Sequence, residues 1–342
     1  MKVLSTVLAV AVALLLSGIA LADDVVRVGI VNASSDAGFL IADRKGYFKQ
    51  EGIRAEFVVF DSAAKMVAPL GTGQLEVGAG SASAGLYNAV ARGVDIKIVA
   101  DKGSTPPGYG FQPLLVRKDL VDSGRFKSLK DLKGMKIAGS APGSASTSTL
   151  NEALKKAGLN YHDVERVFLG FPQHVVALQN KAVDASMTTE PSATRAVQSG
   201  AAVRVMGDDE IYPNHQLAVV LYSADFIKAK PDVGRKLMRA YLKGVRDYND
   251  ALKDGRLAGP NAEEVIRILT EATEIKDPAI YRAITPNGCN PNGHVHMPSL
   301  RNDLAFYKSD KQVEANVTVE QVVDSSFVDW ALKELGPYKP RR

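Results

Sequence analysis

The residues with the clearest chemical potential form a Gly-, Ser- and Thr-rich run, AGSAPGSASTSTLNEALKKAGL, between Ala138 and Leu159. A short apolar stretch at its start predicts the end of a strand, and the later spacing of apolar residues predicts a helix. A helix that begins near Ser144 presents free backbone amides and a positive dipole end, which favour an anion or a hydrogen-bond acceptor. Gly143 permits close approach to the backbone. We therefore expect ligand contacts from four residues: Ser140, Gly143, Ser144 and Ala145.

Two other interpretations of this run stay open. Ser and Thr residues at a helix start also act as N-caps without any ligand. In addition, Thr149 and Glu152 form a T-x-x-E capping box, which would place the helix start about one turn later.

Two segments nearer the N-terminus also place small residues directly after predicted strands. In open α/β sheets, ligands bind beyond the carboxyl ends of the strands, where helix N-termini point inward. Gly80 is expected to leave space for the ligand, and loop capping is the alternative explanation for both segments. The residues expected to contact the ligand here are Asn32, Ser34, Gly80, Ser81 and Ala82.

Glu190 is the most informative charged residue, because it follows a strand-like segment that ends at Thr188 and precedes Pro191. Its carboxylate is placed to accept a hydrogen bond from an amino or ring NH group of a ligand, and Thr188 is expected to line the same site. Stabilisation of a helix dipole explains an acidic residue at this place equally well.

Aromatic residues flank the two segments, FQPLLVRKD and HQLAVVLYS, that are the candidates for strands crossing between two α/β units. Tyr109, Phe111, Tyr212 and His215 are placed to sandwich a planar ligand group or, alternatively, to pack the hinge. His215 would also make a pH-sensitive contact with a carboxylate.

A loop near the C-terminus, NGCNPNGHVHMP, contains donor atoms for copper or zinc in Cys289, His294, His296 and Met297. Its two imidazoles face one side only in an extended segment, whereas its Pro, Asn and Gly content predicts an irregular loop. The chain also lacks G-x-S-x-G, Walker A and G-x-G-x-x-G motifs. We therefore expect no metal, no cofactor and no catalytic activity.

The N-terminus has the pattern of a secretory signal peptide: Lys2, an apolar run and Ala20-Leu21-Ala22 before Asp23. A membrane anchor is the alternative. Because Asp23 rather than a cysteine follows the cleavage point, we expect residues 1–22 to be removed and the product to be periplasmic rather than a lipoprotein. The single cysteine, Cys289, excludes an internal disulfide.

The composition argues against binding to nucleic acid. Without Lys2, 41 basic and 38 acidic side chains give the mature chain a net charge of +3, which is too balanced for a polyanion partner. About 320 residues usually divide into two domains.

Strand-like and helical patterns alternate, which predicts α/β units with helices on both faces of each sheet. Beyond Tyr222 we expect helices only, the first of them beginning at Pro231. The predicted strands of the first unit are 25–31, 53–60, 75–79 and 96–100, and those of the second are 135–138, 164–169, 183–188 and 202–206. The predicted helices include 38–48, 83–92, 262–273, 298–308 and 324–335.

Five motifs occur in an order that resembles the periplasmic binding proteins of nitrate, sulfonate, taurine and thiamine-precursor ABC transporters. They are GFLIADRKGYFKQEGI, GTGQLEVGAGSASAGLYNAVARG, SLKDLKGMKIAGSAPGSAS, ALQNKAVDASMTTEP and DSSFVDWALKELG. The resemblance covers nearly all of the mature chain. It implies a type II fold with two lobes, two crossover hinges and a helical C-terminal part. Lobe I is expected to comprise 23–114 and 222–342, and lobe II 115–221.

The resemblance implies a monomeric solute receptor that closes on a small polar or anionic organic molecule and delivers it to an ABC permease. Sulfonates, carboxylates, nitrate and pyrimidines are the open ligand classes. Relatives often carry an aromatic residue where Thr189 stands, so taurine or thiamine-precursor specificity does not transfer directly. A periplasmic enzyme on the same fold and a ligand-sensing subunit of a membrane receptor are the alternatives. Pyrimidine-forming relatives carry a cysteine-rich iron-binding run that this chain lacks.

Overall fold

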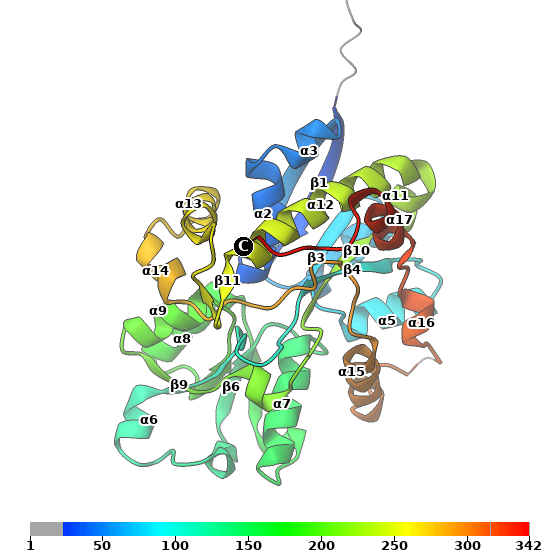
Figure 1. The fold of residues 1–342 in the computed structure, drawn as a ribbon. Helices are drawn as coiled ribbons and strands as arrows, with labels where there is room; N and C mark the ends of the chain where they lie inside the picture. The colour runs from blue at the N-terminus through cyan, green and yellow to red at the C-terminus, as the bar shows by residue number, and fades with distance from the viewer. Residues whose placement is uncertain (1–22, 315, 342) are drawn as a thin grey trace, which may run out of the picture.

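The computed structural model describes residues 23–314 and 316–341, so the predicted signal peptide lies outside the described residues. The described chain forms two five-stranded sheets and one small hairpin. Figure 1 shows the first sheet in the upper half of the molecule and the second in the lower half. No helix within the described ranges is long and apolar enough to cross a membrane.

The first sheet has the strand order β2-β1-β3-β10-β4. Its strands β1, β2 and β3 are parallel, whereas β10 pairs antiparallel with β3 and β4. Every residue of β3 and β10 is buried, as expected for central strands covered on both faces. The strands are β1 (Asp24–Ile30), β2 (Ile53–Val59), β3 (Val77–Gly80), β4 (Lys97–Gly103) and β10 (Ala218–Tyr222).

The second sheet has the order β7-β6-β8-β5-β9, with β5 antiparallel to both of its neighbours. All of these strands fall in segments with predicted strands, and β5 lies in FQPLLVRKD, which was predicted as a crossing strand. The strands are β5 (Leu114–Arg117), β6 (Lys136–Gly139), β7 (Glu165–Phe168), β8 (Ala185–Met187) and β9 (Ala202–Met206).

The chain crosses between the sheets twice, as predicted, but the two segments expected to cross, FQPLLVRKD and HQLAVVLYS, mainly form β5 and β10, each of which lies within one sheet. It passes from β4 to β5 through residues 104–113, and it returns from β9 to β10 through residues 207–217. The predicted lobe boundaries need correction by a few residues, because Leu114 pairs within the second sheet and residues 218–221 pair within the first.

Helix α12 (Pro231–Ala251) is the long helix over the first sheet, and it begins at Pro231 as predicted. Its apolar face is buried at Leu237, Tyr241, Val245 and Tyr248. The other elements around this sheet are η1 (Ser34–Asp36), α2 (Ala37–Arg44), α3 (Tyr47–Gln50), η2 (Ala63–Met66), α4 (Val67–Gly71), α5 (Ala84–Ala91), α11 (Ala224–Ala229), α13 (Ala262–Ala272), α14 (Pro278–Ala283) and α17 (Ser326–Leu335).

Helix α15 (Met297–Ser309) contacts both lobes. It lies beside α7 (Ala145–Lys156) of the second lobe (Figure 1), where Ser148 donates a 2.5 Å hydrogen bond to Asp303, and its Tyr307 ring lies 6.4 Å from the Tyr87 ring of α5. Sequence order alone did not reveal this placement, because the apolar face of a helix does not identify its partner. The remaining elements are α6 (Lys118–Asp122), η3 (Leu129–Leu132), η4 (Tyr161–Asp163), α8 (Phe171–Gln179), α9 (Ser192–Gln198), α10 (Asp208–Ile211) and α16 (Val319–Val322).

The prediction that only helices follow Tyr222 is also wrong. A short hairpin joins β11 (Leu252–Lys253) and β12 (Arg256–Leu257). Its turn residues, Asp254 and Gly255, have φ angles of 50° and 71°, as a tight Asp-Gly hairpin turn requires.

The contact between α2 and α12 depends on glycine at position 244. A methyl group there would overlap the carbonyl oxygen of Gly38, so Gly244→Ala should force the helices apart and cost about 1 to 3 kcal/mol. Calorimetry should show a fall in Tm of several degrees, at about 2 to 4 °C per kcal/mol. Gly85→Ala is the matched control, because its methyl group would meet nothing closer than 3.6 Å. An equal effect of both changes would contradict the packing argument.

Candidate functional site

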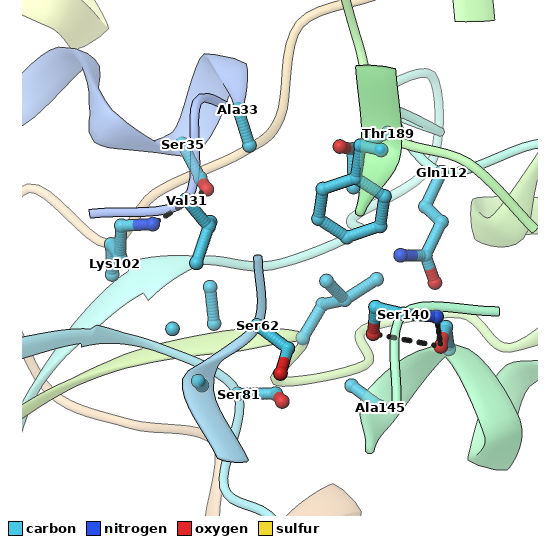
Figure 2. A pocket seen from close by; sticks show the side chains of 16 residues that line it. Val31, Ala33, Ser35, Ser62, Ser81, Lys102, Gln112, Ser140, Ala145 and Thr189 are labelled. Atoms are coloured by element: carbon cyan, nitrogen blue, oxygen red, sulfur yellow. Dashed lines mark hydrogen bonds between the residues drawn. The ribbon is translucent and has the colours of Figure 1, made fainter. Parts of the chain in front are cut away.

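A cavity lies between the two sheets, close to both crossover segments. It encloses about 370 Å³ of empty space including its mouth, and residues of both lobes line it (Figure 2). Apolar contacts come from Val31, Ala63, Phe171 and Leu217, and most of the remaining wall carries hydroxyl, amide or amino groups. This combination suits a small ligand with one polar and one apolar part.

Lys102 supplies the positive charge of the first-lobe wall. It stands near the end of β4, and its Nζ lies 2.7 Å from Asp36 Oδ1 and 3.0 Å from Ser35 Oγ. Both charged side chains are almost completely buried, so each requires the other to offset its desolvation. Asp36 also accepts a 2.9 Å hydrogen bond from the Ala33 amide. The wall therefore holds an ammonium group whose charge is balanced.

Gln112 and Thr189 supply unpartnered polar groups on the opposite wall. The side-chain oxygens Gln112 Oε1 and Thr189 Oγ1 are buried and have no hydrogen-bond partner within the described structure. Figure 2 shows both residues beside the cavity, across from Lys102. An unsatisfied buried polar group costs about 1 to 3 kcal/mol, so a ligand that pairs with these groups gains that amount.

Helix α7 begins at Ala145 with Ser144 as its N-cap residue, close to the predicted start. The later start suggested by the Thr149 capping box is wrong, because Thr149 lies inside the helix and donates to the Ala145 carbonyl at 3.1 Å. Ala145 and Ser146 line the cavity, and first-turn amides have no acceptor within the helix. Ser144 itself is buried, and its hydroxyl donates to the Ala141 carbonyl at 2.8 Å.

Protein atoms approach both Gly143 and Gly80 closely, and Gly80 also lines the cavity. The Gly143 carbonyl accepts a 2.7 Å hydrogen bond from the Ala84 amide at the start of α5, across the lobe boundary. A methyl group on Gly143 would overlap the Ala84 side chain, and one on Gly80 would overlap Ala63. The Gly-rich run before α7 and the segment around Gly80, which were both predicted to contact the ligand, therefore contact each other directly.

Glu190 does not line the cavity, so its predicted ligand contact is not supported by the geometry. Its Oε2 accepts from the Thr194 amide at 2.8 Å, and its Oε1 lies 3.3 Å from Arg204 Nη1 and 3.4 Å from the Thr285 amide. Burial raises the pKa of Glu190. Its carboxylate thus acts as a helix cap and a bridge to the first lobe, which is the dipole alternative.

Tyr212 and His215 pack in the hinge rather than around the cavity. Their rings stack at 4.1 Å, and His215 Nε2 lies 2.8 Å from Asp303 Oδ2 while Nδ1 lies 3.2 Å from Thr149 Oγ1. The expected contact between His215 and a carboxylate exists, but the carboxylate belongs to the protein. Phe111 likewise packs between the crossovers, against Leu217 and Ala145.

The other predicted residues divide by location. Gly80, Ser81, Ser140 and Ala145 line the cavity. Thr188 and Ala82 are buried without lining it, Tyr109 lies at a separate surface hollow, and Asn32 and Ser34 line a second cavity.

The possible metal ligands of the Cys289 loop do not form a cluster. Cys289 is buried beside the Asp101 carbonyl, whereas His294 binds Asp329 at 3.0 Å. No group of three His, Cys, Asp or Glu side chains suited to a metal occurs in the part of the chain that the structure describes.

Several residues that line the cavity were missed from the sequence: Ser35, Ser62, Lys102, Gln112, Phe171 and Thr189. The predicted strand 96–100 ended too early, and the polar residues Asp101 and Lys102 concealed the continuation of β4 to Gly103. A strand extended by three residues would have placed Lys102 at a carboxyl end and marked it as a candidate.

Two α/β lobes joined by two crossover segments, with a polar cavity between them, define the fold of the periplasmic binding proteins. The chain belongs to the NMT1/THI5-like family, whose model matches residues 34–252. This assignment confirms the resemblance suggested by the five motifs.

Known proteins with similar sequences or structures are mostly binding proteins. A Brucella abortus (strain 2308) relative, whose name describes it only as a binding protein, is 29% identical over 72% of this chain and 74% of its own. The nitrate-binding protein NrtA from Synechocystis PCC 6803 has a TM-score of 0.77 at 15% identity, covering 94% and 92% of the two chains. The alkanesulfonate-binding protein SsuA from Xanthomonas axonopodis pv. citri, bound to MOPS, has a TM-score of 0.70 at 18% identity, covering 89% and 99%. The desulfurization enzyme DszB has a similar fold, with a TM-score of 0.60 at 15% identity over 91% and 99%.

A buried carboxyl group in the returning crossover should make stability depend on pH. Burial raises the pKa of Asp208 to about 7, from about 3.9 in an unfolded chain. The protonated group therefore stabilises the fold at low pH, and this contribution is lost progressively as the pH rises from about 4 to about 7. Asp208→Asn should raise Tm relative to wild type by about 2 °C or more at pH 8, and by less at pH 5.

Thermal unfolding across pH 5 to 8 measures this difference. Asp232→Asn, at an exposed position, is the control and should not change the slope. Burial also raises the pKa of Asp101 to about 6. Because Asp101 is present in the wild type and in both variants, its effect on Tm cancels when they are compared. A constant Tm difference between Asp208→Asn and wild type across the range would contradict the prediction.

Proposed function

We propose that this protein is the solute-binding component of an ABC importer and captures a small organic monoanion between its lobes. The observation that carries the proposal is the cavity lined from both lobes, with Lys102 and the start of α7 in its wall and the side chains of Gln112 and Thr189 across from Lys102. Family membership and the NrtA and SsuA structures support the same conclusion.

The charges around the cavity favour a single negative charge on the ligand. Lys102 is neutralised by Asp36, no Asp or Glu side chain lines the cavity, and the N-terminus of α7 adds a partial positive charge. Phe171 and Leu217 provide an apolar surface for the rest of the molecule. Alkyl or aryl sulfonates and carboxylates fit this pattern better than neutral pyrimidines.

Transport requires the ligand to favour the closed arrangement of the lobes. The described lobes already touch through two backbone hydrogen bonds, from Ala84 to Gly143 at 2.7 Å and from Ser34 to Glu190 at 2.8 Å. A ligand that contacts both walls shifts the population toward this state, which a membrane permease then recognises. The protein would act as a periplasmic monomer after removal of residues 1–22.

A binding role is better supported than catalysis. Thr149, His215 and Asp303 are aligned as hydroxyl, imidazole and carboxylate, but all three are buried and none of them lines the cavity. The cavity wall itself contains no His, Cys, Asp or Glu side chain to serve as a general base. Co-purification with a permease, rather than with a receptor kinase, would distinguish transport from sensing.

A thermal-shift screen identifies the ligand class. At 100 times Kd, a ligand of the folded state adds roughly 2.7 kcal/mol, which corresponds to a rise in Tm of roughly 5 to 10 °C. Monoanionic sulfonates or carboxylates should give the largest shifts, and phosphate monoesters with two charges should give smaller ones. A screen in which only neutral compounds stabilise the protein would contradict the charge argument.

Gln112→Ala tests the cavity directly with the best compound from that screen. Titration calorimetry should show affinity reduced at least tenfold, because the amide would no longer pair with the ligand. Tm without ligand should stay equal or rise slightly, since an unsatisfied buried group is removed. Gln179→Ala, exposed on α8, is the control and should bind normally. Unchanged affinity of Gln112→Ala would place the ligand elsewhere.

Gly143→Ala tests closure of the lobes. Its methyl group would overlap the Ala84 side chain, so ligand should no longer reduce the radius of gyration measured by small-angle scattering. Gly158→Ala is the matched control. Gly158 also has a positive φ, 72° against 56° at Gly143, but an added methyl group there would meet no atom within 4 Å, so this variant has the backbone strain without the steric overlap. If both variants close normally with ligand, the contact at Gly143 does not control closure.

A further inference from the structure

A second and larger cavity lies between the lobes on the side of α13 and α14. It encloses about 1280 Å³ of empty space including its mouth. Figure 1 shows α14 next to α8 and α9 of the second lobe, and residues from all of these elements or their flanking turns line the cavity. The ligand cavity described above does not include it, although Ala33 borders both.

A backbone contact separates the two cavities. The Ser34 amide of the first lobe donates a 2.8 Å hydrogen bond to the Glu190 carbonyl of the second. Ser35 and Thr189 lie on the side of the first cavity, whereas Ser34 and Pro191 line the second. A ligand in the second cavity would therefore occupy a site of its own.

The first-lobe wall of the second cavity includes a buried apolar part. Leu40, Leu269 and Tyr281 form buried surface there, and the half-buried Ile275 and Ile280 lie near the opening. The Tyr281 hydroxyl is already engaged with Thr273 Oγ1 at 2.5 Å, so the ring offers only its apolar surface. This wall suits a flat or branched hydrocarbon group.

The second-lobe wall carries one charge, on Arg195. It consists of Pro172, Pro191, Ser192 and Arg195, and the exposed Arg195 makes no ion pair with any residue that the structure describes. Opposite it lie Glu274, Lys276 and Asp277, and the buried Asp36, whose carboxylate is paired with Lys102, also lines the cavity. The Asp277 carboxylate is engaged as the N-cap of α14, accepting from the Ala279 amide at 2.8 Å. A guanidinium group with free donors is suited to a sulfonate or carboxylate.

We propose that this second cavity binds an amphipathic organic anion, with its hydrocarbon part against Leu40, Leu269 and Tyr281 and its acidic group at Arg195. Because the walls come from both lobes, such a molecule stabilises the closed arrangement independently of the transported ligand. Binding at the two cavities is then linked, and each occupant raises the affinity for the other.

Fluorescence titration with 8-anilinonaphthalene-1-sulfonate tests the site, since this dye is an aryl sulfonate whose emission rises in apolar surroundings. The folded protein should bind one dye molecule. Ala272→Trp, which fills the cavity from the end of α13, and Arg195→Gln, at an exposed position, should each weaken binding at least tenfold. Circular dichroism confirms that each variant is folded.

Two controls separate the alternatives. Arg125→Gln removes another exposed and unpaired second-lobe arginine and should leave dye binding unchanged. Gln112→Ala alters only the first cavity and should also have no effect. Loss of dye binding in Gln112→Ala but not in Ala272→Trp would place the dye in the first cavity, which overturns this inference and leaves the proposed transport function intact. Equal dye binding by wild type, Ala272→Trp and Arg195→Gln would overturn it as well.

Discussion

The buried carboxylate of Asp101 holds the hinge on which the rest of the structure depends. It accepts hydrogen bonds of 2.6 Å from Gln216 Nε2 and 2.7 Å from the Asn290 amide, so it joins β4, the returning crossover and the 289–296 segment. The oxygen of the Gln216 side chain also has a partner, because Oε1 accepts a hydrogen bond from the His296 amide at 2.7 Å. The residues that follow Asp101 and Gln216 in the chain, Lys102 and Leu217, line the ligand cavity. The geometry of the cavity therefore follows from a polar network behind it, in which every member has a partner.

Closure and ligand selection rest on different kinds of groups. The lobes meet through backbone atoms, at Ala84 with Gly143 and at Ser34 with Glu190, and these contacts require only that no side chain intervenes. Selection rests on side chains, chiefly the unpartnered oxygens of Gln112 and Thr189 and the neutralised ammonium group of Lys102. Relatives with the same fold can therefore close in the same way around different solutes, because changes in the cavity wall leave the closing contacts unaltered.

The sequence predicted the fold more completely than the site. The alternation of strands and helices, the crossovers and the beginning of α7 were all predictable, because they depend on local periodicity, capping and proline placement. Of the predicted ligand-contacting residues, Gly80, Ser81, Ser140 and Ala145 line the cavity. Glu190 and His215 instead satisfy other protein groups, Thr194 and Asp303 among them. A charged or aromatic residue at a strand end marks the correct region, but the direction of its side chain depends on the partners that folding brings to it.

By itself, the sequence determined the order of the elements, the two crossovers and the family, and these suffice for a two-lobed binding protein. Hydrophobic periodicity and motif order are properties of a continuous chain and need no knowledge of distant contacts. Only the tertiary structure decided which polar groups stay unpaired and face the cavity. Nothing in the sequence around Gln112 or Asp303 indicates whether its side chain finds a partner. In the structure, Gln112 Oε1 has no hydrogen-bond partner among the described residues, whereas the Asp303 carboxylate binds His215. Whether a buried polar group is hydrogen-bonded depends on residues that the whole fold brings next to it, so a local sequence pattern cannot predict it.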